Sequence, residues 1–245
     1  MQKTGKKITV SPKPPCRSAC NALLFALILV GTGALAAPAG EVTHVSGALL
    51  LRKSDGSSKI LAPKSQVETG DLLATATDTY ARVKFTDGGE VTLRPNTQLR
   101  IESFSFEQNA SDKDSAIFSL LKGGLRTITG LVGKRKANSY EMRTTVATIG
   151  IRGTNYGAQI CQDDCQNVRN SEGKVPLNGL HLDVADGVIS VTNKGGEVLF
   201  SSGQFGYVQT ITTPAANVPP AQGVTKNMPG FSGPPAGNNA ECAVQ

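Results

Sequence analysis

The sequence has no tryptophan, and its 245 residues include only two histidines and four tyrosines. Imidazole is the most common general base in enzymes, yet neither His44 nor His181 lies at an informative spacing from a nucleophile. Aromatic side chains on which nucleic-acid bases stack are too few and too scattered to form a binding platform. These shortages argue against catalysis and against nucleic acid as a partner.

Long apolar runs are also absent after residue 36. The one apolar run, residues 22–30, follows five cations, which are Lys3, Lys6, Lys7, Lys13 and Arg17. This order is typical of a secretory signal peptide, and we predict one over residues 1–36. Cleavage between Ala36 and Ala37 fits, because Ala34 and Ala36 place small side chains at the third and first positions before the cut.

A signal anchor is the alternative, but the run is shorter than the roughly 20 residues that a membrane-spanning helix needs. We therefore expect a periplasmic, secreted or cell-surface protein with no stable membrane insertion after cleavage. The leader contains five of the 25 cations and none of the 19 anions. Twenty cations and nineteen anions then remain, so the net charge falls from +6 to +1 and the pI of about 9.1 does not indicate a polyanionic partner.

Three cysteines follow the leader: Cys161, Cys165 and Cys242. In an exported protein, Cys161 and Cys165 are best interpreted as a disulfide that closes a small loop, with Cys242 left over in a tail. A metal site is the alternative, but it needs further ligands, and the two histidines lie far away in sequence. We expect no metal and no cofactor.

Glycine and proline are abundant by contrast, with 27 and 13 residues. From Glu41 onward apolar and polar residues alternate, as in residues 80–85, which is the pattern of half-buried strands. Hairpin turns are predicted at Asp55-Gly56, Asp87-Gly88-Gly89, Gly123-Gly124 and Gly195-Gly196, and a further turn at Asp186-Gly187. We predict an all-β fold whose antiparallel hairpins stack as a sandwich or as a short solenoid-like domain.

The domain is expected to cover residues 41–210. Residues 161–178 are polar and predict an exposed loop pinned by the disulfide. Residues 213–245 contain six of the ten prolines that follow the leader and almost no charge, which predicts a disordered tail.

Four ordered motifs resemble the FecR domain family of exported bacterial proteins. They are Val67-Glu68-Thr69-Gly70-Asp71-Leu72-Leu73, Phe85-Thr86-Asp87-Gly88-Gly89-Glu90-Val91-Thr92-Leu93-Arg94-Pro95-Asn96-Thr97, Gly123-Gly124-Leu125-Arg126 and Thr145-Val146-Ala147-Thr148-Ile149-Gly150-Ile151-Arg152-Gly153-Thr154. The resemblance extends over roughly Glu41 to Tyr207. It implies an all-β periplasmic domain, whose founding members relay a signal from an outer-membrane transporter to a sigma factor.

Those founding members also carry a cytoplasmic anti-sigma segment, a membrane span and a receptor-contacting region. This chain departs from them, because it has a short basic leader in front and a proline-rich tail behind. The resemblance therefore implies an extracytoplasmic interaction module rather than a complete transmembrane signalling protein.

Two groups are candidate binding residues. Arg152 and Thr154 belong to the last motif, and the Arg152 guanidinium can present its fork to a carboxylate or to backbone carbonyls. Gly150 and Gly153 beside it fit a strand bulge or a close strand crossing, and the favoured interpretation is a structural arginine that ties two strands together. Lys134, Arg135 and Lys136 form the basic cluster that remains after the leader, either for lipopolysaccharide phosphates or acidic glycans, or as a solvated loop.

The carboxylate pairs, Asp163 with Asp164 and Asp183 with Asp186, are interpreted as loop and turn groups rather than as a calcium or catalytic site. The sequence thus predicts a non-catalytic domain that binds an unidentified envelope protein in signalling or envelope organisation. The alternative is a polysaccharide-binding or adhesive module, for which only Tyr80, Tyr140, Tyr156 and Tyr207 are available to stack on a sugar.

Overall fold

The computed structural model describes residues 37–109 and 111–224, together with four isolated positions before residue 12. The predicted signal peptide, its cleavage residue Ala36 and the tail from residue 225 onward, with Cys242, lie outside these segments. Within the described segments, no helix has both the length and the apolar character that crossing a membrane requires.

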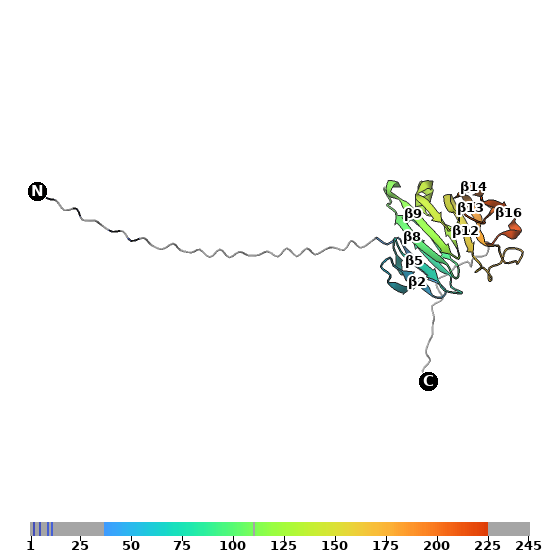
Figure 1. Ribbon diagram of the computed structural model, residues 1–245, viewed down its shortest axis with the longest axis horizontal. Helices are drawn as coiled ribbons and strands as arrows, with labels where there is room; N and C mark the ends of the chain where they lie inside the picture. The colour runs from blue at the N-terminus through green and yellow to red at the C-terminus, as the bar shows by residue number, and fades with distance from the viewer. Residues whose placement is uncertain are drawn as a thin grey trace, which may run out of the picture. The chain divides into compact units, whose positions relative to one another are not determined.

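The described chain consists mainly of strands (Figure 1), which confirms the predicted all-β fold. The strands are β1 (Gly40–Val45), β2 (Leu49–Arg52), β3 (Ser58–Leu61), β4 (Gln66–Val67), β5 (Leu72–Thr75), β6 (Ala81–Phe85), β7 (Glu90–Leu93), β8 (Gln98–Ser105), β9 (Ser115–Lys122), β10 (Gly124–Ile128), β11 (Tyr140–Arg143), β12 (Thr148–Cys161), β13 (Gly179–Asn193), β14 (Gly196–Ser201), β15 (Phe205–Val208) and β16 (Ala216–Val218). The helical elements are α1 (Leu131–Arg135) and the 3-10 turns η1 (Ser111–Lys113), η2 (Ala137–Ser139) and η3 (Pro220–Gln222).

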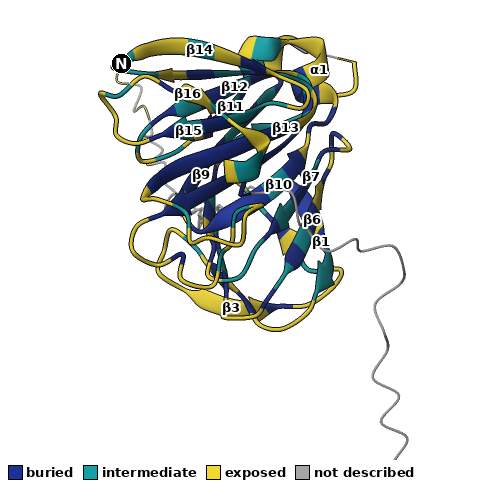
Figure 2. Ribbon diagram, turned by 90° about the vertical axis from the view of Figure 1, so that its right-hand side faces the viewer, coloured by how far each residue is buried: buried dark blue, intermediate teal, exposed yellow. Residues whose placement is uncertain are grey.

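Within the described residues, the strands form one hydrogen-bonded sheet that curls back on itself, in the order β3-β2-β5-β8-β9-β11-β12-β10-β7-β6-β1-β4 with β13 beside β12. We call β2, β3, β5, β8, β9 and β11 the first layer, and β1, β4, β6, β7 and β10 the second layer. The layers face each other, because the Phe85 ring of β6 lies 5.1 Å from the Phe104 ring of β8 and 5.0 Å from the Phe118 ring of β9. The packing is therefore that of a sandwich made from a single sheet. In Figure 2, β9 and β13 are largely buried, whereas β3 and β14 at the margins are largely exposed.

The two longest strands, β12 and β13, join the layers. The first residues of β12, Thr148 and Ile149, pair with β11 of the first layer, whereas residues 155–159 pair with β10 of the second layer. On its other side β12 pairs with β13 along nearly its whole length. One long hairpin therefore continues both layers, and β14 and β15 extend its two ends.

The predicted hairpin at Gly123-Gly124 and the predicted turn at Asp186-Gly187 are wrong. Gly123 does turn the chain, with φ of 75°, but β9 and β10 on either side of it do not pair with each other. The turn instead carries the chain from the first layer to the second. Asp186-Gly187 is no turn either, because β13 runs straight through it. The antiparallel prediction also has an exception, since β9 and β11 are parallel.

The loop over residues 162–178 contains no strand or helix and follows the Cys161–Cys165 disulfide, as predicted. The predicted disordered tail, however, includes described residues that are ordered. The segment 216–218 forms β16 and pairs with β15, and Val224 is buried. Proline is tolerated beside a short edge strand, so the prolines here did not prevent order before residue 225.

Candidate functional site

The strands β12, β13 and β14 run side by side (Figure 1). A hollow of about 750 Å³ lies on the outer face of the sheet at these strands. We call it the trough. It is lined by Ala137 and Asn138 of η2, Gly150, Ile151 and Arg152 of β12, Val188 and Ser190 of β13, and Glu197, Leu199 and Ser201 of β14. The alternate residues of the same strands, such as Ile189 and Phe200, are buried on the inner face. The period of two therefore separates core from trough.

Small side chains make this part of the sheet hollow. Gly150, Ser190 and Leu199 lie side by side in one row across the three strands. A Cβ at Gly150 would lie only 2.7 Å from Ser190 Oγ, so no larger residue fits there without displacing that hydroxyl. Leu199 is 63% exposed at the outer end of this row. The floor is thus small and polar, and one side is apolar.

Opposite charges mark the two ends of the trough. Arg152 is in the row with Val188 and Ser201, whereas Glu197 is four residues before Ser201 on β14, in the row with Thr192. Within the described chain neither Arg152 nor Glu197 forms an ion pair within 4.0 Å. The interpretation of Arg152 as a structural tie between strands is therefore not supported, and its guanidinium faces solvent.

A bulge aims Arg152 outward, as the glycines beside it predicted. Arg152 pairs with Val188 and Asn155 with Asp186, so two residues of β12 oppose the single Gly187 of β13. Gly153 and Gly187 have φ of 57° and 81°, which glycine adopts without a steric penalty. The bulge shifts the register by one residue and separates Arg152 from the residues that follow.

Thr154 lies on the opposite side of this bulge and is buried. Its N–H donates to Thr129 Oγ1 at 2.9 Å, and its carbonyl accepts from the Thr129 N–H at 3.0 Å. The prediction of Thr154 as a binding residue therefore does not fit the structure. It fastens β12 to the segment that leads into α1.

The basic cluster divides into one structural residue and two solvent-facing ones. Arg135 Nη1 lies 3.2 Å from Asp114 Oδ2, and the guanidinium also donates to the carbonyls of Glu107 and Gln108. Lys134 and Lys136 are exposed and form no ion pair within the described segments. Lys136 directly precedes η2, which lines the trough, so only these two lysines can add positive charge near it.

His181 is a structural histidine. His181 is 7% exposed, its ring lies 4.9 Å from that of Tyr207, and its Nε2 is 2.8 Å from the Leu177 carbonyl. Burial lowers the pKa of His181, and the hydrogen bond to Leu177 opposes that shift. Among the described residues there is no group of three or more His, Cys, Asp and Glu side chains that can hold a metal.

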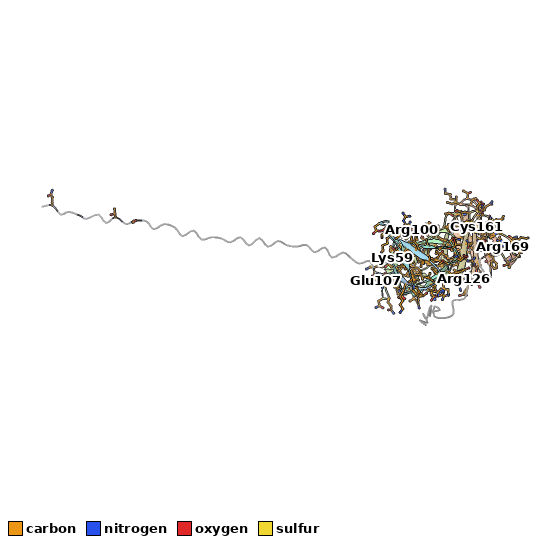
Figure 3. The ribbon with its side chains drawn as sticks, turned by 90° about the horizontal axis from the view of Figure 1, so that it is seen from below. Lys59, Arg100, Glu107, Arg126, Cys161 and Arg169 are labelled. Atoms are coloured by element: carbon orange, nitrogen blue, oxygen red, sulfur yellow. A yellow bond between two sulfur atoms is a disulfide. The ribbon has the colours of Figure 1, made fainter. Side chains whose placement is uncertain are left out.

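Three of the four aspartates in the carboxylate pairs have local partners, whereas Asp186 is exposed. In the loop, Asn178 Nδ2 donates to Asp163 Oδ1 at 2.8 Å, and Asp164 accepts from the Gln162 N–H at 2.9 Å. Asp183 is buried beside Arg126, which Figure 3 labels, with Arg126 Nη2 2.6 Å from Asp183 Oδ2. Such pairing is what a buried carboxylate needs, so these aspartates have structural partners.

Two of the four tyrosines are unavailable to a sugar. Tyr140 and Tyr156 are buried and their hydroxyls lie 3.0 Å apart, and burial raises the pKa of Tyr140 to about 12. Tyr207 packs on His181. Tyr80 lines a second hollow of about 450 Å³ with Arg94 and with residues of the disulfide loop. That hollow is lined by Asp78 and Asp164 as well as by Arg94 and Arg169, so its charges balance.

Glu197, Leu199 and Ser190 were missed by the sequence reasoning. The signal was present, because residues 196–201 alternate between outward and inward side chains. The sequence does not reveal that β14 lies in the same sheet as the Arg152 segment of β12, with only β13 between them.

The described chain is thus a single curled β-sheet that packs as a sandwich and carries a charged trough on its outer face. Residues 71–176, somewhat under half of the chain, match the family model described as FecR protein, so this part of the chain is similar to FecR proteins. Arg152 and η2 lie inside the matched range, whereas β13 and β14 lie beyond it.

Two crystal structures of a candidate anti-sigma factor from Parabacteroides distasonis ATCC 8503, at 1.65 and 2.50 Å resolution, are similar to part of the chain. The TM-scores are 0.44 and 0.43 at 13% sequence identity, and the match covers 60% of this chain and 58% of that protein. The chain thus spans less than two thirds of that protein's length. No curated protein sequence matches this chain.

Proposed function

We propose that the chain is an exported, non-catalytic envelope module that binds a protein partner through the trough, in signalling or in envelope organisation. The observation that carries the proposal is Arg152, which belongs to the family motif and yet is exposed with no ion pair in the described structure. A guanidinium held open beside small polar side chains is suited to a carboxylate of a partner.

Several features support binding rather than chemistry. The trough is lined by Ser190 and Ser201, but no histidine lines it, so neither hydroxyl has an imidazole base there. FecR-type proteins are regulatory rather than typically enzymatic, and the similarity to them supports a role in envelope signalling. The periplasmic or cell-surface location is part of the proposal and depends on the predicted signal peptide.

The test compares two exposed arginines. Tagged mature chain is cross-linked to the envelope proteins of its host, and the captured partner is quantified by mass spectrometry. Arg152→Ala should reduce capture by about tenfold or more, because removing one member of a desolvated charge pair typically costs 2 kcal/mol or more. Arg52→Ala on β2, an exposed arginine outside the trough, is the matched control and should leave capture unchanged.

Equal capture by wild type and Arg152→Ala would refute the trough as the binding site. Absence of any partner specific to the wild type would refute the function itself. Polysaccharide binding is examined in the same preparation by titration with peptidoglycan fragments, where a saturable signal would favour the alternative module.

A further inference from the structure

We propose that the outer edge of β14 accepts an extended segment of the partner protein as an additional antiparallel strand. The inference rests on the proposed function and deepens it, because it states how the partner lies in the trough. It does not follow from the family match, since β14 lies beyond residues 71–176.

The hydrogen-bond alternation of the β13–β14 hairpin shows which groups face outward. Gly196 pairs with Asn193 across the two-residue turn, and the Ser202 N–H donates to the Gly187 carbonyl at 3.0 Å. Bonded and non-bonded pairs alternate in an antiparallel ladder. Val198 and Phe200 therefore bond to β13, whereas Glu197, Leu199 and Ser201 direct their N–H and C=O groups away from it.

The Ser201 end of this edge is closed by the chain itself. The Ser201 N–H donates to Gln204 Oε1 at 2.6 Å, and the Ser201 carbonyl accepts from the Gln204 N–H at 3.0 Å. Within the described segments, no strand pairs with the outer side of β14. Glu197 and Leu199 therefore present two donors and two acceptors, which is the pattern that one added strand satisfies.

The other edge strands of the described sheet are less suited to this role. β4 and β16 have two and three residues, and β3 carries the exposed Lys59 in its middle, which is a common protection against unwanted pairing. β14 is longer and has Leu199, 63% exposed, at its centre, with no lysine or arginine along it.

The charges of the trough specify the chemistry of the added strand. In antiparallel register, a residue opposite Leu199 is apolar and one opposite Glu197 is basic. The partner residue beside Ser201 lies just beyond the part of the edge that can bond, in the row of Val188 and Arg152, three strand spacings or about 14 Å from the Arg152 backbone. A glutamate there extends toward the Arg152 guanidinium over two short side chains. From its N-terminus to its C-terminus, the partner segment thus has an acidic, an apolar and a basic residue at alternate positions.

The test uses a synthetic peptide, acetyl-Thr-Glu-Thr-Leu-Thr-Lys-Thr-amide, and a control peptide with Glu and Lys exchanged. Binding to the mature chain is measured by fluorescence anisotropy, and hydrogen exchange is followed by NMR. We expect saturable binding of the first peptide, at least about fivefold weaker binding of the second, and slowed exchange at the Glu197 and Leu199 amides.

Two matched proline variants test the backbone edge. Leu199→Pro removes an outward N–H without touching the β13–β14 ladder, and proline is compatible with such an edge position. Ile60→Pro does the same on β3, because the Lys53 N–H bonds the Ser57 carbonyl and places Ile60 at an outward position. Leu199→Pro should weaken peptide binding about tenfold, and Ile60→Pro should not. If Leu199→Pro fails to fold, hydrogen exchange at the Glu197 and Leu199 amides of the wild type tests the added strand without the variant.

No saturable binding, equal binding of both peptides, protection outside β14 or equal loss in both proline variants would each overturn the proposal. Dimerisation of the chain alone that Leu199→Pro abolishes would assign the edge to a second copy instead. If the envelope partner is lost with Arg152→Ala but retained with Leu199→Pro, the proposed function stands and the added strand is refuted.

Discussion

Gly187 shows how strongly one residue constrains this sheet. It has φ of 81°, and a Cβ placed on it would lie 2.5 Å from the Gly153 carbonyl oxygen. We expect Gly187→Ala to lower the free energy of unfolding by about 3 kcal/mol, because backbone strain and a backbone collision add. Equilibrium urea unfolding measures this loss.

Gly56 is the matched control. Its φ of 85° is similar, but nothing lies within 4 Å of the position of a Cβ. Gly56→Ala should therefore cost only about 1 kcal/mol, the penalty of the left-handed conformation alone. Similar losses in the two variants would show that the approach of β12 to β13 is not tight.

His181 predicts a pH dependence of stability. Burial lowers its pKa in the folded chain, so the unfolded chain binds a proton first as the pH falls. The His181 contribution is therefore complete above the ordinary histidine pKa of about 6.5 and is lost as the pH falls through that value toward the folded pKa. We expect wild type to lose more stability than His181→Gln between pH 8 and pH 5 in urea unfolding. Parallel loss in both proteins would contradict the prediction.

The sequence motif shows the bulge beside Arg152 but not the burial of its neighbour Thr154. Both belong to one motif, and the glycines around Arg152 correctly predicted a bulge. The bulge, however, reverses the period of two, so that Thr154 points inward although the motif alone does not show it. Register across a bulge depends on the partner strand, and β13 begins 25 residues after Thr154.

Among the elements, α1 is tied to the segment between β8 and β9 by Arg135. Arg135 pairs with Asp114, whose side chain is 1% exposed, and its guanidinium carbon lies 5.1 Å from the Phe106 ring centroid. Arg135→Ala should lower the free energy of unfolding by about 2 kcal/mol, because it leaves the Asp114 carboxylate buried without its cation. Lys134→Ala, in the same helix and exposed, should change it by less than about 0.5 kcal/mol.

Thermal or urea unfolding of both variants checks this contrast. Equal stability of Arg135→Ala and wild type would mean that the ion pair is dispensable and would return Arg135 to the candidate binding residues. A strong effect of Lys134→Ala would contradict the division of the basic cluster.

Local turns were predictable where both strands lie next to each other in sequence. The β2–β3, β6–β7 and β13–β14 hairpins follow their Gly-containing turns. The Gly123 turn has the same composition but leads between layers, because β9 and β10 find other partners. Turn chemistry fixes the reversal of the chain, whereas long-range packing selects the partner strand.

At the scale of the whole molecule, removal of the leader determines the net charge of the exported chain. If the leader is removed as predicted, the exported chain starts at Ala37 and carries a net charge of +1. Amino-terminal sequencing of protein recovered from the host envelope should therefore read Ala37-Pro38-Ala39. A start at Met1 would indicate a retained anchor and would place the domain on a membrane tether.

The β12–β13 hairpin also bears on what counts as the unit of folding. The family match covers residues 71–176, which contain β5 to β12 but omit β13 and the whole of β1 to β4. A fragment with those limits would leave β12 without the strand that pairs with it along most of its length, and β6 without β1. Each would then present a row of unsatisfied backbone groups to other chains. The range that matches the family model is therefore shorter than the part of the chain that folds as a unit. A protein cut to residues 71–176 would aggregate.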